Sequence, residues 1–190
     1  MCKTRCAKKI LILLIGIILV LAYVGTYYSV NTQYPQNTRI IHKSNESFLY
    51  NNVTVTVKNT VFVEHEEFIN NKDIMEALGE SSDYPENVSD LIVVEMEFFN
   101  ETTDDIQVDL TGLHLESNDF SLQFYYPLML YYNNSGMYLE LKKGERKILK
   151  MPVPISKSYF TASAWSDVRE RDYYVVSSLY PEKVMTKITF

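Results

Sequence analysis

The chain has 190 residues, of which 46% are hydrophobic and 13% aromatic, and its formal net charge is −6. Four of its 18 basic residues precede Ile10 and all 24 acidic residues follow it, so the rest of the chain carries a net charge of −10. Such a body is repelled by nucleic acid unless a local basic patch intervenes, and the only dense basic stretch, Lys142–Lys150, is interrupted by Glu145 and is interpreted as a solvated face, so no nucleic-acid partner is expected. Its wealth of aromatic and β-branched residues excludes a disordered stalk.

An uncharged apolar segment, Ile10 to Val24, follows the basic leader. Extended to Tyr28 it has about 19 residues, close to the roughly 20 that a membrane-spanning helix needs. We therefore expect residues 1–9 to be a cytoplasmic leader and residues 10–28 to be a transmembrane signal-anchor. Because basic residues favour the inner side of a membrane, the C-terminal body is expected outside the cytoplasm, in a single-pass arrangement.

Cleavage as a signal peptide is the alternative to a permanent anchor. The two candidate cleavage sites, Ala22-Tyr23-Val24 and Tyr23-Val24-Gly25, place a branched or bulky side chain where a small one is needed, so an uncleaved anchor is favoured. Both cysteines, Cys2 and Cys6, precede the apolar segment. The sequence therefore contains no lipobox, and no disulfide is expected in the body.

Residues 29–45 are polar and are interpreted as a spacer that includes an edge strand at Arg39–His42. The strict alternation of Val53–Val57 predicts a half-buried strand. The apolar pattern resumes at Val61–Val63, either as a bulged continuation of that strand or as a second strand. The acidic cluster Glu64–Glu67 is interpreted as a solvated strand edge.

A change of period predicts one short helix over residues 70–78, with Asn71 or Asp73 as its cap and Gly79 as its end. Residues 81–90 then read as a loop that contains Tyr84-Pro85. The continuous apolar run Leu91–Phe99 is the strongest strand signal and is expected at the centre of a sheet.

After a polar turn at residues 100–105, the alternating run Ile106–Leu110 is either the second arm of a hairpin or a crossover to a facing sheet. Lys143-Gly144 predicts a tight turn, Pro152 and Pro154 are expected to end pairing, and Tyr159–Arg171 is ambiguous between helix and loop. The remaining strands are predicted at Leu113–Glu116, Ser121–Tyr126, Met137–Leu141, Arg146–Met151, Tyr173–Leu179 and Val184–Phe190.

Seven to nine short strands with one small helix predict an all-β fold, a two-sheet antiparallel β-sandwich over residues 46–190 preceded by a transmembrane helix. Three segments carry a resemblance to a known family: the strand and turn Val93–Thr102, the segment Leu139–Glu145, and the ending Tyr173–Val184 with its Leu179-Tyr180-Pro181-Glu182. In them the chain resembles the Ig-like extracytoplasmic domains of unknown function of Gram-positive surface proteins and lipoproteins. That family is related in fold to a secreted immunoprotective antigen of mycobacteria.

The resemblance covers residues 53–190 and implies an Ig-like sandwich, but it brings no catalytic residues. Two of its residues have a physical explanation. Asn100, at a strand end, can hydrogen-bond the backbone of its own turn, and Gly144 can supply a positive φ.

No pattern in the sequence names a reaction. The three histidines, His42, His65 and His114, lack metal-ligand spacing, and Asp104-Asp105 with Asp109 is interpreted as solvated surface. The body contains no nucleophile motif. We therefore expect no catalytic, cofactor-binding or metal-binding residue, no cofactor, and no enzymatic activity.

Five tyrosines are the candidate surface-binding residues: Tyr125, Tyr126, Tyr131, Tyr132 and Tyr138. Adjacent rings on a strand point to opposite faces, so one of each pair is expected to face outward, where it suits glycan stacking or a protein interface. Packing of both sheets by tyrosine is the competing explanation. Five Asn-x-Ser/Thr sequons leave a second question open, between a glycosylated eukaryotic ectodomain and an asparagine-rich bacterial protein.

These observations favour a membrane-anchored extracytoplasmic module that binds an unknown protein or an envelope glycan at the cell surface. The alternative is a structural or accessory subunit of a membrane or envelope complex, and a small envelope hydrolase ranks below both.

Overall fold

The computed structural model describes residues 2–33, 38–78, 90–118 and 120–190. It consists of two compact units, Met1–Asn37 and Thr38–Phe190, which we describe separately. The expected helix end at Gly79, the Tyr84-Pro85 loop and the sequon at Asn87 lie outside the described residues.

The first unit contains one long helix, α1 (Cys2–Gln33). Its segment Leu13–Gln33 has a mean hydropathy of 2.0 and is long and apolar enough to span a membrane, a property that signal sequences share. The helix continues through residues 29–33, which we had assigned to the spacer. There Asn31 and Thr32 donate side-chain hydrogen bonds to the carbonyls of Tyr27 and Tyr28, four residues earlier, so these polar residues stay within the helical ladder.

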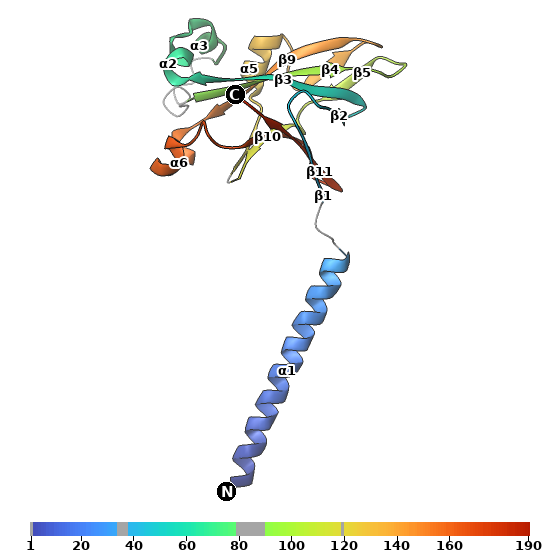
Figure 1. Ribbon diagram of the computed structural model, residues 1–190, viewed down its shortest axis with the longest axis vertical. Coiled ribbons are helices and arrows are strands. Elements are labelled where there is room, and N and C mark those ends of the chain that lie inside the picture. Colours follow the sequence, from blue (N-terminus) through green and yellow to red (C-terminus); the bar gives the residue numbers. More distant parts are fainter. Residues whose placement is uncertain (1, 34–37, 79–89, 119) are drawn as a thin grey trace. The chain divides into compact units, whose positions relative to one another are not determined.

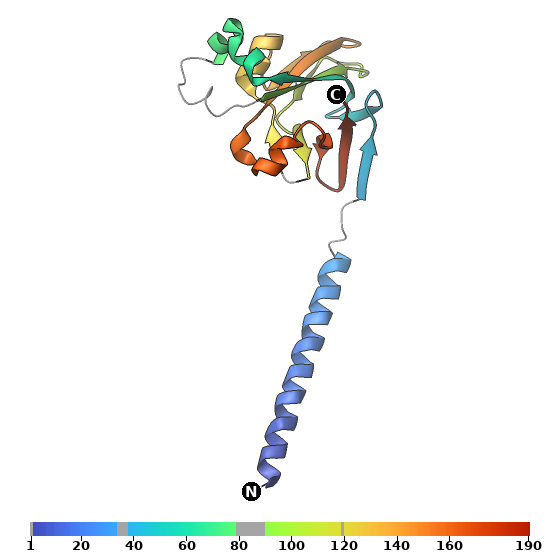
Figure 2. The ribbon, with the colours of Figure 1, turned by 60° about the vertical axis from the view of Figure 1, so that its left-hand side comes forward.

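Strands arranged in three sheets make up most of the second unit (Figures 1 and 2). Sheet A has the order β1-β11-β10-β6-β7, formed by Thr38–His42, Glu182–Ile188, Tyr173–Ser178, His114–Ser117 and Phe120–Gln123. Sheet B has the order β2-β3-β4-β9, formed by Ser47–Tyr50, Val53–Glu64, Asp90–Phe99 and Arg146–Ile155. Sheet C pairs β5 (Ile106–Asp109) with β8 (Tyr138–Leu141).

The main hydrophobic core is shared by the three sheets. Sheet B contributes Val55, Val94 and Met151, sheet A contributes Leu115 and Val175, and sheet C contributes Val108 and Leu139. All seven are buried, because alternate residues of each strand point to the same face. The expected β-sandwich domain is therefore confirmed as a mostly β body.

The expected central position of the strand Leu91–Phe99 is confirmed, because β4 lies between β3 and β9 in sheet B. The ambiguity after Val57 is resolved as a bulge, because the register of β3 against β4 shifts between Val57 and Asn59. The extra residue, Lys58, changes which residues face the core: Phe62 then packs against the main core while Val61 is exposed.

One feature of sheet A was predicted wrongly: it is not purely antiparallel, because β1 pairs with β11 in parallel. A parallel pair needs a long connection, and nearly the whole domain connects these two strands. The predicted strand at Arg39–His42 is confirmed as an edge strand, and through it the body begins at Thr38, inside the segment expected to be a spacer.

The expectation of a single short helix was also wrong, since short helices form at α2 (His65–Asn70), α3 (Lys72–Leu78), α5 (Tyr126–Asn133), η1 (Lys157–Tyr159) and α6 (Ala162–Ser166). In the acidic cluster, Glu64 ends β3, and Glu66 and Glu67 fall in the positively polarised first turn of α2. All three side chains are exposed, as expected of a solvated edge. The expected cap of α3 is confirmed at Asn71, whose Oδ1 accepts the Ile74 N–H.

Helices α2, α3 and α5 lie beside one another on the outer side of sheet B (Figure 1). A second, small core there joins Ile74 of α3 and Leu128 of α5 to Leu91 and Val93 of β4. Strand β4 is therefore covered on both faces along its first half, which explains its continuous apolar run.

Candidate binding surface

Two of the five candidate tyrosines are packed into the fold and three are exposed. The expected strand over Ser121–Tyr126 ends at Gln123, and Tyr125 instead precedes α5, whose first turn contains Pro127. Residues seven apart share one face of a helix, so Tyr125 and Tyr132 both pack against the small core. One ring of each adjacent pair, Tyr126 and Tyr131, is exposed as expected, but the predicted reason, alternation across a strand, was wrong because these residues belong to a helix and its start.

Three of the tyrosines and two other large apolar side chains are exposed within residues 126–138. Tyr126, Leu130, Tyr131, Met137 and Tyr138 are between 37% and 54% exposed, and we call this set the α5–β8 patch. All of it comes from α5, the following loop and the start of β8. The Tyr131 and Tyr132 rings are in edge contact, with centroids 5.1 Å apart, which fixes part of the patch. Burial raises the pKa of Tyr132, and the nearby Tyr131 and Glu67 raise it further.

An apolar pocket of about 350 Å³ opens beside the patch. Its lining includes Leu110, Leu113, Phe124, Met129 and Met137. The ring of Tyr126 also borders it and lies directly against Gly136, where an added Cβ would collide with the ring. The exposed ring of Tyr126 thus lies at the edge of an apolar pocket.

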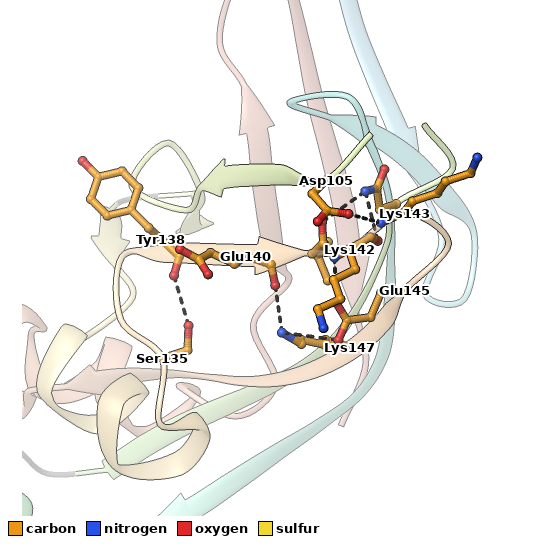
Figure 3. Close-up of polar contacts among 10 residues, drawn as sticks. Asp105, Ser135, Tyr138, Glu140, Lys142, Lys143, Glu145 and Lys147 are labelled. Carbon is orange, nitrogen blue, oxygen red and sulfur yellow. Dashed lines mark hydrogen bonds and ion pairs between the residues drawn. The ribbon is translucent and has the colours of Figure 1, made fainter. Parts of the chain in front are cut away.

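Sheet C carries polar side chains on the face opposite to its core residues. Strand pairing sets Gln107 opposite Glu140 and Asp109 opposite Tyr138, while Val108 and Leu139 point to the core. Figure 3 shows Tyr138 and Glu140 along β8, with Lys142 and Lys143 in the turn that follows. The Tyr138 carbonyl accepts a hydrogen bond from Ser135 Oγ at 3.1 Å, which ties the preceding loop to the strand.

The charged residues at the far end of β8 are mostly used to hold turns (Figure 3). Glu145 accepts the Lys142 N–H at 2.7 Å, and Asp105 accepts the Lys143 N–H at 2.8 Å. The bond from the Lys142 N–H is the main reason that the pKa of Glu145 lies below its usual range. Bonds from Thr111 lower the pKa of Asp109 in the same way.

Asn100 joins two of the segments on which the family resemblance rests. It is fully buried, and its side-chain amide donates to the carbonyls of Asp104, Leu141 and Lys142 at 2.8–3.2 Å. Its Oδ1 accepts the Thr102 N–H at 3.0 Å. The prediction that Asn100 bonds its own turn is confirmed, and it also fastens that turn to the β8–β9 turn, where Gly144 has φ +71°.

Hydrogen bonding and burial also bear on which of the sequon asparagines are accessible to glycosylation. Asn100 is buried, unlike a glycosylation acceptor, and the amide of the partly exposed Asn133 donates hydrogen bonds to the carbonyls of Met129 and Lys150. Asn45 and Asn52 are exposed.

The three histidines are not brought together. His42 packs against Phe48, the His65 N–H donates to Asp90 at the start of α2, and the buried His114 lies 4.0 Å from Glu116. Within the described part of the chain, no group of three or more His, Cys, Asp or Glu residues is placed to hold a metal ion.

Comparison with known proteins finds one family and several solved structures. The yjhA protein of Bacillus subtilis is 14% identical, with a TM-score of 0.46 over 78% of this chain and 99% of that one. An uncharacterized beta-sandwich protein of Clostridium difficile 630 is 9% identical, with a TM-score of 0.40 over 81% of this chain and 95% of that one.

A Bacillus subtilis protein described as a candidate lipoprotein, ycdA, is 14% identical, with a TM-score of 0.47 over 76% of this chain and 38% of that one. No curated protein sequence matches the chain. The family model described as "Domain of unknown function (DUF5028)" matches residues 26–184. Because this match spans most of the chain, the protein belongs to the DUF5028 family.

Proposed function

We propose that the protein is a non-catalytic binding module, held at the cell surface by α1, which recognises a component of the cell envelope through the α5–β8 patch. The observation that carries this proposal is the patch itself: five large apolar side chains exposed together beside an apolar pocket. Contiguous exposed apolar surface is costly in water, and in soluble domains it marks interaction sites.

The location is the second part of the proposal. Helix α1 acts as an uncleaved single-pass anchor, with its basic end in the cytoplasm and an Ig-like domain outside. The apolar span and the basic leader support this orientation, and the three segments that resemble Gram-positive surface domains support the Ig-like assignment.

Comparative capture tests the proposal. The full chain is expressed in the producing cell, cross-linked in intact envelopes and recovered, beside a variant that carries both Tyr126→Ser and Tyr131→Ser. We expect the wild type to retain an envelope component that this variant loses. A matched control, Tyr159→Ser, removes an exposed tyrosine from η1, which belongs to the same domain but not to the patch.

Equal recovery by all three proteins would contradict the role of the patch. If a defined assembly of membrane proteins were recovered equally by all three, the accessory-subunit alternative would replace the binding module. Both tyrosines are exposed, so loss of binding is not expected to reflect unfolding; circular dichroism of each purified variant checks this point.

A further inference from the structure

A polar groove lies beside the patch, between sheet C, the α5–β8 loop and strand β9. Its volume is about 420 Å³, within the range of small-molecule sites. The polar side chains that line it come from all three of these parts: Gln107, Asn134, Ser135, Tyr138, Glu140 and Lys147. Tyr138, one of the exposed residues of the patch, also lines this groove.

The register of sheet C places an amide, a carboxylate and an aromatic ring within one small area. Gln107 and Glu140 are cross-strand partners on the outer face, and such pairs have Cβ atoms about 5 Å apart. Tyr138 lies two residues before Glu140 on the same strand and therefore on the same face. Its ring extends away from the polar end of β8 (Figure 3) and is 54% exposed.

Some of the hydrogen-bonding groups in the groove already have a partner within the described part of the protein, and others do not. Lys147 Nζ donates to the Glu140 carbonyl at 2.8 Å, and Ser135 Oγ donates to the Tyr138 carbonyl. Among the described contacts, the side chains of Gln107, Asn134 and Glu140 make no hydrogen bond or ion pair. An amide offers donors and an acceptor and a carboxylate offers acceptors, so together they can pair with vicinal hydroxyl groups, which both donate and accept.

We propose that this groove binds a neutral saccharide, with one sugar face stacked on Tyr138 and its hydroxyl groups bonded to Gln107, Asn134 and Glu140. The inference rests on the proposed function and gives the ligand class for the same surface. An aromatic ring with an apolar face and a polar edge suits a sugar, which presents C–H groups on one face and hydroxyl groups around its rim.

Charge favours a neutral ligand over an anionic one. The body has a net charge of −10, and the groove contains Glu140 with Asp109 nearby on the same face. The single lysine of the groove, Lys147, already donates to a carbonyl and lies 3.5 Å from Glu145. The net negative charge of the body and the two carboxylates on this face therefore disfavour an acidic polysaccharide.

Calorimetric titration of the full chain in lipid nanodiscs tests the proposal, since detergents with sugar headgroups would compete for the groove. The probes are three neutral oligosaccharides, tetra-N-acetylchitotetraose, cellotetraose and mannotetraose, and one anionic oligosaccharide, a hyaluronan hexamer. We expect at least one neutral probe to bind and the hyaluronan hexamer to bind at least tenfold more weakly. Absence of binding by all three neutral probes overturns the proposal.

Variants locate the binding in the groove. Tyr138→Ala should weaken the affinity for the bound probe about tenfold, whereas Tyr138→Phe should keep it within a factor of about three because the ring face is retained. Tyr159→Ala is the matched control and should bind as the wild type does. If Tyr138→Ala binds unchanged, the saccharide lies elsewhere and the assignment of the groove is wrong.

The failure of this inference and the failure of the proposed function are distinguishable. If no neutral probe binds but the Tyr126→Ser, Tyr131→Ser variant still loses an envelope component, the binding module stands and its ligand is not a saccharide of this class. If the probes bind but the Tyr126→Ser, Tyr131→Ser variant recovers the same envelope components as the wild type, the groove is a saccharide site and the patch has no part in recognition.

Discussion

At the scale of single residues, Asn100 does more than shape its own turn. One buried amide satisfies carbonyls from two turns that are about 40 positions apart in the chain, and it closes one end of the domain. Removing it would take this partner from the buried Leu141 carbonyl and from the Thr102 N–H, whereas the Lys142 and Asp104 carbonyls would keep bonds from the Glu145 N–H and from Thr102 Oγ1. Buried polar groups of the backbone cost more when orphaned than their bonds contribute when made.

We therefore expect Asn100→Ala to lower the free energy of unfolding by about 2–4 kcal/mol. Asn100→Asp should cost more, because a carboxylate oxygen would face the three carbonyls that now receive an N–H. Chemical denaturation of the full chain, followed by near-UV circular dichroism, measures both. Gln107→Ala, an exposed change on sheet C, should stay within about 0.5 kcal/mol of the wild type, and a similar small effect of Asn100→Ala would refute the argument.

A second residue, Tyr173, makes the free energy of unfolding depend on pH in the alkaline range. Tyr173 is fully buried and its hydroxyl donates to the Val168 carbonyl at 2.7 Å. Burial is the main cause that raises the pKa of Tyr173 to about 12. In the unfolded chain a tyrosine ionises near pH 10, so between pH 10 and 12 the unfolded state loses a proton that the folded state keeps.

The stabilising contribution of this proton is thus complete below pH 10 and is lost as the pH rises toward 12. Over that interval we expect the free energy of unfolding to fall by up to about 3 kcal/mol on account of Tyr173. Urea titrations at pH 9, 10, 11 and 12 measure the slope. Tyr173→Phe should flatten it; a variant slope as steep as the wild-type slope would show that another group is responsible.

Predictions of the roles of single residues from the sequence succeeded where those roles depend only on the local backbone. The turn roles of Asn100 and Gly144 follow from the chemistry of an amide side chain and of a residue without Cβ. The faces of the tyrosines did not follow, because they depend on whether the backbone has a helical or an extended period. The signal for a helix was present: Pro127 near its start, and Tyr125 and Tyr132 seven residues apart.

At the scale of elements, strand β9 shows why prolines need not end a strand. The expectation that Pro152 and Pro154 end pairing was wrong, because β9 remains paired with β4 through Ile155. Strand β9 is an edge strand, and the Pro152 carbonyl accepts a bond from the Tyr125 N–H on the side away from β4. The proline nitrogen lies on the same outer side, where no ladder bond is lost.

The same free edge is covered at Lys150 by a side chain of α5. The Asn133 amide accepts the Lys150 N–H and donates to its carbonyl, both at 2.8 Å, much as a neighbouring strand would. We expect Asn133→Ala to speed hydrogen exchange of the Lys150 amide about tenfold and to leave that of Met151, which faces β4, unchanged. Exchange measured by NMR tests this, with Tyr131→Ala as a control on the same helix.

If the Lys150 amide exchanges equally fast in Asn133→Ala and in the wild type, α5 does not protect the edge.

The partner of strand β5 could not be predicted from the sequence. An alternating pattern predicts that Ile106–Leu110 is extended, but it does not name the partner strand, and β5 pairs with the distant β8 instead of β4. Local periodicity carries no information on long-range register.

At the scale of the whole molecule, the class of fold and the apolar helix followed from composition and pattern, whereas the number of sheets and the parallel β1–β11 pair did not. The candidate surface followed only in part. Three of the five tyrosines that the sequence singled out are exposed, and the groove beside Tyr138 is assembled from three separate segments. Contacts between residues far apart in the chain are set by the packing of the elements, which a single sequence does not reveal.

The proposed anchor has a test that uses the protein's own cysteines. Both lie in the leader, at Cys2 and Cys6, and the body has none. If α1 is an uncleaved anchor with its basic end inside, a membrane-permeant maleimide should label the protein in intact protoplasts and an impermeant one should not. Tyr159→Cys places a thiol on the exposed surface of the body and should become reactive to the impermeant reagent.

Each other outcome has a distinct physical meaning. Labelling of the wild type by the impermeant reagent would reverse the orientation. Failure of the denatured, purified protein to react with any maleimide would mean that the leader has been removed, because cleavage after the apolar segment takes both thiols with it. The intact mass of 22.1 kDa, measured on the same sample, is then expected to be reduced, so that thiol labelling and mass together decide whether this acidic β-domain stays tethered to the membrane or is released.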